Sequence, residues 1–132
     1  MDKKHLCQKA IDAMRDAYAP YSEYTVGAAL LCDDGSIYTG CNIENSSYSV
    51  TACAERVALF KAVSENHRVF RAIAIAGGKK ENIEGIFSPC GVCRQALSEF
   101  CTPDMPILLV KNENEFEEYT LGQLLPQSFS LR

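Results

Sequence analysis

The sequence predicts an α/β fold, a three-layer α-β-α sandwich around a central mixed sheet. Two observations carry this prediction. An amphipathic helix and a strand hairpin open the chain, and helices and strands alternate after them. Helices that alternate with strands cover both faces of the sheet they connect. The length of 132 residues suits one hydrophobic core, so we expect a single domain over residues 1–132.

Apolar residues at helical spacing predict the helices. We expect them over residues 2–18, 51–65 and 89–100, with a short helical turn over 121–125. Pro20 closes the first helix, and Thr51 is available as the N-cap of the second. Pro89 is expected at the first helical position of the third, where its missing N–H costs nothing.

The strands are predicted from β-branched and apolar runs bounded by turn residues. We expect them over residues 25–32, 36–42, 70–76, 86–88, 107–110 and 116–119. Asp33-Asp34-Gly35 joins the first two as a hairpin. Gly77-Gly78 is expected to end the third, and a polar loop that looks long follows over residues 79–85.

Composition excludes several classes of partner and location. The net charge is −4 and no basic run appears, which argues against nucleic-acid binding. No run approaches the ~20 apolar residues of a membrane span, and the N-terminus does not resemble a signal peptide. We therefore expect a cytoplasmic protein with a small-molecule partner. In that compartment, seven cysteines suggest metal binding or catalysis rather than disulfides.

Two segments at predicted helix starts carry the chemistry: Thr51-Ala52-Cys53-Ala54-Glu55-Arg56 and Ser88-Pro89-Cys90-Gly91-Val92-Cys93-Arg94-Gln95. The two cysteines of the second segment, Cys90 and Cys93, are three residues apart, so they lie on one helical face. They can share a metal with Cys53 of the first segment. The glutamate is expected near the metal rather than bound to it. Three ligands without an obvious fourth are typical of a catalytic zinc, which keeps one position open for water.

The predicted position at helix starts favours thiolates, because the positive end of the helix dipole lies there. Three thiolates and Zn²⁺ sum to a charge of −1, so we expect positive groups nearby. Arg56 and Arg94 are the candidates, and either could donate hydrogen bonds to the thiolates.

A non-enzymatic reading also stands, in which the cysteines form a structural zinc or thiol module. Such a site needs a fourth ligand, and the candidates have no ligand-like spacing: Cys41, Cys101, His5 and His67. Cysteines outside the two motifs are expected to be small core or surface residues, namely Cys7, Cys32, Cys41 and Cys101. His5 and His67 are expected to be solvated.

The C-x-E and P-C-x-x-C motifs together resemble the zinc nucleobase deaminases. Further blocks resemble the small, homotetrameric cytidine deaminases from one end of the chain to the other: Ala19-Pro20-Tyr21-Ser22, Val26-Gly27-Ala28-Ala29-Leu30, Gly40-Cys41-Asn42-Ile43-Glu44-Asn45, Ser46-Ser47-Tyr48 and Leu124-Leu125-Pro126. This resemblance implies five strands in the central sheet and one zinc ion per chain, held by Cys53, Cys90 and Cys93. It also implies a homotetramer with active sites shared between subunits.

The resemblance assigns further roles. Glu55 matches the general acid/base, and Arg56 and Gln95 match residues around the thiolates. The substrate-binding positions comprise Asn42 and Glu44 at the ribose, Tyr24 where relatives commonly carry Phe against the base, Tyr48, and Phe129 stacking on the base of a neighbouring subunit.

The implied function is hydrolytic deamination of free cytidine and deoxycytidine to uridine and deoxyuridine in pyrimidine salvage. Zinc-bound hydroxide would attack C4 while Glu55 shuttles protons. A blasticidin-type aminonucleoside deaminase is the alternative within the enzyme class, although Asn42-Ile43-Glu44-Asn45 favours an ordinary ribose. A deoxycytidylate or tRNA deaminase would want a basic phosphate site, and Glu44 would repel phosphate.

Overall fold

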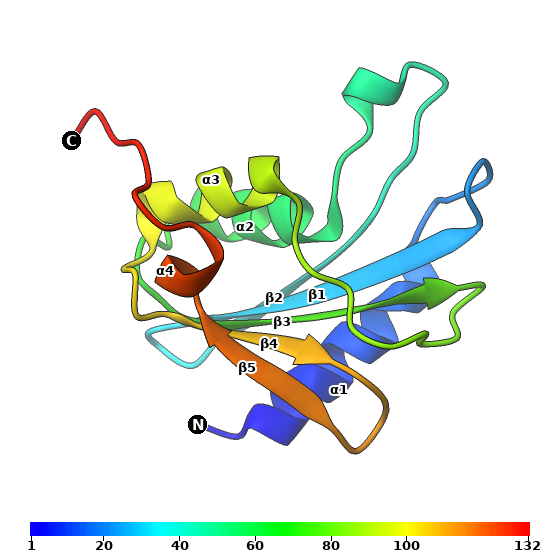
Figure 1. Ribbon diagram of the computed structural model, residues 1–132, viewed down its shortest axis with the longest axis horizontal. Helices are drawn as coiled ribbons and strands as arrows, with labels where there is room; N and C mark the ends of the chain where they lie inside the picture. The colour runs from blue at the N-terminus through cyan, green and yellow to red at the C-terminus, as the bar shows by residue number, and fades with distance from the viewer.

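The structure, a computed structural model that describes residues 1–132, is built on one mixed sheet (Figure 1). The strands are β1 (Tyr24–Cys32), β2 (Ile37–Cys41), β3 (Phe70–Lys79), β4 (Pro106–Val110) and β5 (Phe116–Thr120), in the spatial order β2-β1-β3-β4-β5. β3 and β4 are parallel, and the other neighbouring pairs are antiparallel. The predicted mixed five-stranded sheet is confirmed.

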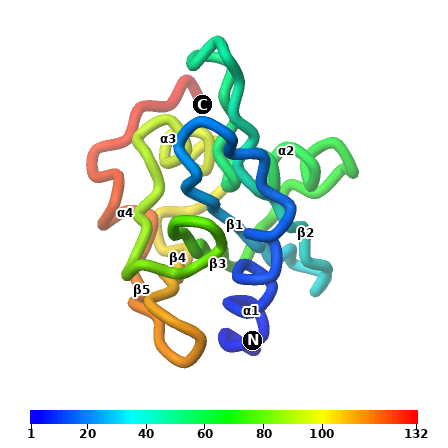
Figure 2. The backbone as a smooth tube through the Cα atoms, turned by 90° about the vertical axis from the view of Figure 1, so that its right-hand side faces the viewer, coloured from blue at the N-terminus to red at the C-terminus, as the bar shows by residue number.

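Helices cover both faces of this sheet. They are α1 (Lys3–Ala13), α2 (Ala54–Ser64), α3 (Gly91–Phe100) and α4 (Leu121–Leu124), with 3₁₀ turns at Met14–Asp16 and Tyr48–Val50. α1 lies on one face, and α2 and α3 lie on the other, as Figures 1 and 2 both show. The three-layer prediction is therefore also confirmed. None of the helices combines the length and apolar character needed to cross a membrane.

Successive side chains of a strand point to opposite faces of the sheet, so the sheet has a hydrophobic core on each face. In β3 the two cores receive side chains of different size. In β3, Ile73 and Ile75 face α2 and α3, whereas Ala72, Ala74 and Ala76 face α1. Each isoleucine removed from water contributes about 1.5–3 kcal/mol. Small side chains on the other face let α1 pack close to the sheet.

Two glycines of the hairpin set how closely the helices approach. A Cβ at Gly27 would lie 2.1 Å from the carbonyl oxygen of Ala10 in α1. A Cβ at Gly40 would lie 2.4 Å from the carbonyl oxygen of Ala54, in the first turn of α2. The close backbone contact at Gly40 therefore sets the distance between β2 and the first turn of α2, where the Cys-x-Glu motif lies.

The strand predictions need two corrections. Gly77 and Gly78 lie inside β3 rather than after it, because they pair with β1 and leave room for the segment that follows. A Cβ at Gly78 would lie 1.6 Å from the Asn82 carbonyl oxygen. Residues 86–88 form no strand, because they have no sheet partner; Phe87 instead packs its ring against Tyr24.

The predicted helix caps were also wrong. Cys53 and Cys90 occupy the N-cap positions of α2 and α3. The Thr51 hydroxyl does not cap α2; it accepts a hydrogen bond from the Asn45 amide. Pro89 precedes the N-cap instead of occupying the first helical position. The two cysteines are thereby held by extended backbone just before each helix begins.

Candidate active site

Three cysteines converge where the starts of α2 and α3 meet. The sulfur of Cys53 lies 3.8 Å from that of Cys90, which lies 3.4 Å from that of Cys93. All three sulfurs lie within 4.8 Å of one another, with no histidine, aspartate or glutamate in the group. The structure thus brings together the cysteines of both sequence motifs.

One positive group, the Arg56 guanidinium, lies beside the cluster on the α2 side. The Arg56 Nη2 lies 3.5 Å from the Cys53 sulfur and also donates to the Thr51 carbonyl oxygen at 3.3 Å. Hydrogen bonds from the neighbouring Cys93 thiol and from Arg56 lower the pKa of Cys53 to about 5, against the opposing effect of burial. The environment therefore favours a thiolate, the form that binds metal, at Cys53, whereas the hydrogen bond to Cys53 and burial raise the pKa of Cys93.

Glu55 lies beside the cluster with its carboxylate buried and unpartnered. Its exposed fraction is 1%, and neither carboxylate oxygen has a hydrogen-bond partner. Burial raises its pKa to about 7, and the nearby Cys53 charge acts in the same direction. An isolated buried carboxyl group is costly unless a bound species pairs with it.

These observations fit a zinc ion. A tetrahedral zinc with Zn–S bonds of about 2.3 Å places its sulfur ligands about 3.8 Å apart, close to the separations found here. Three protein ligands are the complement of a catalytic site rather than a closed structural one. The unpartnered Glu55 oxygens supply the acceptor that a water molecule near the metal would need.

A cavity of about 310 Å³ opens beside the cluster. Its lining residues are Ser22, Tyr24, Val26, Asn42, Thr51, Ala52, Cys53, Ala54, Glu55 and Phe87. The rings of Tyr24 and Phe87 pack with centroids 5.5 Å apart and a tilt of 36°. The cavity therefore combines apolar walls with Cys53 and Glu55.

An adjoining hollow of about 330 Å³ contains Glu44 and shares Ser22 and Thr51 with the first. The Glu44 Oε1 accepts hydrogen bonds from the amides of Tyr21 and Ser22, at 3.0 and 3.2 Å. Its Oε2 accepts from the Ser22 hydroxyl at 2.5 Å. The Ser22 hydroxyl and both amides lower the pKa of Glu44, so this carboxylate is anionic and fixed in direction. Tyr48, 80% exposed, also lines this hollow.

Asn42 joins the end of β2 to the start of β1. Its Oδ1 accepts from the Val26 amide at 2.9 Å, and its Nδ2 donates to the Tyr24 carbonyl oxygen at 2.8 Å. The side-chain oxygen can accept one further hydrogen bond, and the side-chain nitrogen can donate one further hydrogen bond. Asn42 thus holds the cavity wall and still has hydrogen-bonding capacity toward a ligand.

The remaining candidates lie farther from the cavity. Phe129, 67% exposed on the C-terminal tail, does not line the cavity of its own chain. Gln95 donates from Nε2 to the Phe129 carbonyl oxygen at 3.1 Å. Arg94 reaches no thiolate, contrary to the expectation from its position. Its guanidinium bonds the Pro89 and Leu124 carbonyl oxygens at 2.7 and 2.6 Å, which ties α4 to the start of α3.

Sequence reasoning missed several wall residues. Phe87 reaches the cavity from a loop, where no periodicity indicates which way a side chain points. Ser22 stood inside a family-like block but had no assigned role. Its contact with Glu44 depends on two segments that are far apart in the chain.

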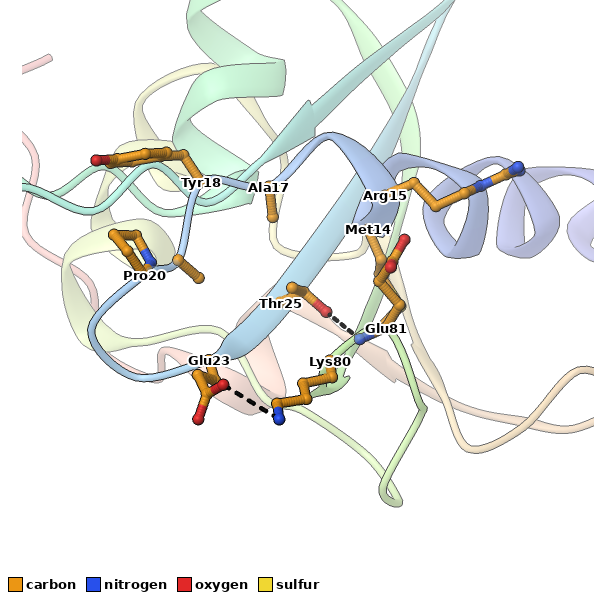
Figure 3. Close-up of a pocket in the computed structure, with 10 residues that line it drawn as sticks. Met14, Arg15, Ala17, Tyr18, Pro20, Glu23, Thr25, Lys80 and Glu81 are labelled. Carbon is orange, nitrogen blue, oxygen red and sulfur yellow. Dashed lines mark hydrogen bonds and ion pairs between the residues drawn. The ribbon is translucent and has the colours of Figure 1, made fainter.

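A different hollow, of about 440 Å³, lies where the segment after α1 meets residues 80 and 81 (Figure 3). Glu23 and Lys80 form an ion pair at 3.3 Å, and the Glu81 amide donates to the Thr25 hydroxyl at 2.9 Å. Neither cysteine nor histidine lines it. The cavity beside Cys53 has both a metal-binding cysteine and the acid-base group Glu55, so it is the candidate active site.

An α-β-α sandwich with cysteines at the N-cap positions of two helices, beside a buried glutamate, defines a zinc-dependent deaminase. A family described as "Cytidine and deoxycytidylate deaminase zinc-binding region" matches residues 1–109. The chain belongs to this family.

Individual relatives agree over nearly the whole chain. A cytidine deaminase from Sporosarcina psychrophila is 51% identical over 98% of this chain and 93% of its own length. One from Halalkalibacterium halodurans is 46% identical over 98% and 96%. A crystal structure of cytidine deaminase from Burkholderia pseudomallei superposes with a TM-score of 0.89 at 40% identity, covering 98% of this chain and 100% of its own. A blasticidin-S deaminase from Bacillus cereus is 30% identical over 83% and 79%.

Proposed function

We propose that the chain hydrolyses the 4-amino group of free cytidine and deoxycytidine, giving uridine or deoxyuridine and ammonia. The observation that carries the proposal is the position of the buried, unpartnered Glu55 beside the three-cysteine cluster, at a cavity with apolar walls. The identity to proteins named cytidine deaminase supports this choice of substrate.

Cys53, Cys90 and Cys93 would hold one zinc ion per chain. When bound, zinc acts as a Lewis acid that lowers the pKa of a coordinated water toward ~7. Arg56 stabilises the thiolate form of Cys53 from outside the ligand set. The N-termini of α2 and α3 add partial positive charge on the same side.

Glu55 would move the protons of the reaction. Its carboxylate accepts a proton from the attacking water and delivers it to N3 of the ring, which makes C4 more electrophilic. The oxygen of the water forms the C4–O bond, and Glu55 then takes the second proton from the new C4 hydroxyl. It would deliver this proton to the 4-amino group as the C4–N bond breaks, so that ammonia leaves and C4 becomes a carbonyl. Burial without hydrogen bonds inside the chain leaves both oxygens available for these transfers.

The two adjoining hollows divide the nucleoside between them. Tyr24, Phe87 and Val26 provide walls for the flat pyrimidine. Glu44, oriented by Ser22, would accept a hydrogen bond from a ribose hydroxyl, with Tyr48 in the same hollow. Asn42, which lines the first cavity, would reach the sugar from that side. Because Glu44 is anionic, a 5′-phosphate near it would be repelled. This disfavours deoxycytidylate and nucleic acid as substrates.

We also propose a homotetramer with shared sites, in which Phe129 covers the base bound by a neighbouring subunit. The exposed Phe129 ring and a cavity open on its own chain support this arrangement. Residues 1–132 would act as one deaminase domain in cytoplasmic pyrimidine salvage.

Two alternatives remain for the test. A blasticidin-type deaminase shares the zinc motifs, and a purely structural zinc module would leave Glu55 without a role. Loss of the cytidine absorbance should be measured with the zinc-loaded protein, with Glu55→Gln as the control. Turnover of cytidine but not of blasticidin S supports the proposal. A zinc-loaded, folded protein inert toward cytidine would exclude it.

A further inference from the structure

A second group of metal-binding side chains lies at the turn of the β1–β2 hairpin. It comprises Cys32 at the end of β1, Asp34 in the turn, and His67 from the segment between α2 and β3. One ligand atom from each lies within 4.8 Å of the others. Tyr24 of the substrate cavity stands at the other end of β1, roughly 26 Å away along the strand. The two groups are therefore separate.

The turn holds Asp34 in place while leaving one carboxylate oxygen free. Asp34 Oδ1 accepts hydrogen bonds from the Ser36 amide at 2.9 Å and from the Ser36 hydroxyl at 2.6 Å. The other oxygen accepts none. A carboxylate oriented by hydrogen bonds to one oxygen and free at the other is a typical metal ligand with outer-shell support.

His67 is also oriented and unpaired. Its ring packs against the Tyr38 ring with centroids 5.2 Å apart and a tilt of 59°, and its amide donates to the Ala62 carbonyl oxygen at 3.0 Å. Neither ring nitrogen makes a hydrogen bond or an ion pair within the chain. His67 is half-buried at this position rather than freely solvated as the sequence suggested.

The donor set suits a transition-metal ion. Sulfur, imidazole nitrogen and a carboxylate oxygen are the ligands that zinc combines in tetrahedral sites. One thiolate and one carboxylate neutralise a divalent cation, so the fully buried Cys32 would carry no uncompensated charge. Tetrahedral ligand atoms lie about 3.3–3.8 Å apart for bonds of 2.0–2.3 Å. The ligand atoms here lie within 4.8 Å of one another. Zinc binding would bring them to the shorter distances by a movement of the exposed Asp34 side chain.

We propose that Cys32, Asp34 and His67 bind a second zinc ion, which fastens the hairpin turn to the segment entering β3. The site joins parts of the chain that are distant in sequence. An ion that binds only the folded state stabilises it in proportion to its affinity. With three protein ligands, water would fill the fourth position, so this is not a closed four-ligand site. The proposed role is to stabilise the turn, and it does not depend on the reaction at the cavity.

The test is a calorimetric titration of Zn²⁺ into the full chain already carrying one zinc at its three-cysteine site. We expect a second equivalent to bind and to raise the melting temperature. His67→Gln and Asp34→Asn should bind it at least about tenfold more weakly, because loss of even an outer-shell partner costs about 10–100-fold. His5→Gln is the matched control, since His5 is the other histidine and lies exposed in α1.

A spectroscopic experiment identifies the ligand. Co²⁺ added to the zinc-loaded protein should give a thiolate-to-cobalt absorption band in the parent and in His5→Gln, and no band in Cys32→Ser. Circular dichroism confirms that each variant is folded. No second equivalent in the parent, or one bound with unchanged affinity by His67→Gln, would overturn the proposal.

Discussion

The guanidinium of Arg56 lies 3.5 Å from the sulfur of Cys53, one turn back along α2. The same group bonds the Thr51 carbonyl oxygen, so it links the segment before α2 to the metal-binding cysteine. A positive charge at this distance partly offsets the charge of three thiolates.

Replacing this arginine should loosen the zinc without unfolding the chain. Arg56→Gln is expected to weaken zinc binding about 10–100-fold, as loss of an outer-shell partner usually does. Competition with a chromophoric chelator measures the change. Arg94→Gln is the comparison, because Arg94 bonds backbone carbonyls and Ser88 rather than a cysteine. Equal zinc affinity in Arg56→Gln and the parent would show that the Cys53 contact has no effect on the metal.

Glu55→Gln should separate proton transfer from folding. The amide has almost the same size, so the variant is expected to fold and to retain one zinc per chain. It cannot relay protons, and the rate should fall by at least about 10²–10⁴-fold, the usual contribution of general acid-base catalysis. Metal analysis and the absorbance assay give the two readouts. Near-normal turnover in a zinc-loaded variant would remove Glu55 from the mechanism.

Glu44→Gln should impair nucleoside handling while leaving zinc in place. A charged hydrogen bond contributes about 1.5–3 kcal/mol, which corresponds to about 10–150-fold in kcat/KM. Ser22→Ala removes the hydroxyl that orients Glu44 and should show a smaller loss of the same kind. Steady-state kinetics with cytidine measure both. If Glu44→Gln processes cytidine as well as the parent, the sugar assignment is wrong.

Gly40→Ala should disturb the active site by displacing α2, the helix whose start carries Cys53 and Glu55. An added Cβ would lie 2.4 Å from the Ala54 carbonyl oxygen and 2.5 Å from the Ala58 nitrogen, so α2 must move away from β2. We expect a loss of at least about 1–3 kcal/mol in unfolding free energy, with weaker zinc binding. Gly91→Ala, where a Cβ meets nothing within 4 Å, should leave stability unchanged or improve it. Denaturant unfolding of the two variants, followed by metal analysis, measures the contrast; equal stabilities would refute the packing argument.

The parts of the fold that sequence could predict are those with local signals. Alternation and turn residues located the five strands, and the cysteine spacing located the metal cluster. β3 runs through Gly77 and Gly78, because pairing with β1 outweighs their weak strand preference. Phe87 and Ser22 were missed as wall residues because their positions depend on contacts between distant segments. The proposed second metal site was not predicted for the same reason, since Cys32 and His67 meet only in the folded chain.

The C-terminal tail offers the sharpest test of a shared active site. Beyond α4 the chain turns at Gln127, which has a positive φ of 54°, and Phe129 then projects with 67% of its surface exposed. Gln95 donates to the Phe129 carbonyl oxygen, which fixes the backbone of the tail where it carries this exposed ring. A large exposed aromatic ring held in this way is well placed to contact a partner.

Phe129→Ala should therefore lower kcat/KM for cytidine while zinc content and fold survive, and deletion of residues 127–132 should do so more strongly. Leu131→Ala is the matched control, because Leu131 lies on the same tail with 91% of its surface exposed and has no proposed contact with the base. Sedimentation should show a stable tetramer for the parent. An active monomer at the assay concentration would refute the shared site. A tetramer in which Phe129→Ala and Leu131→Ala behave alike would refute only the role assigned to Phe129, since assembly and base stacking would then be independent.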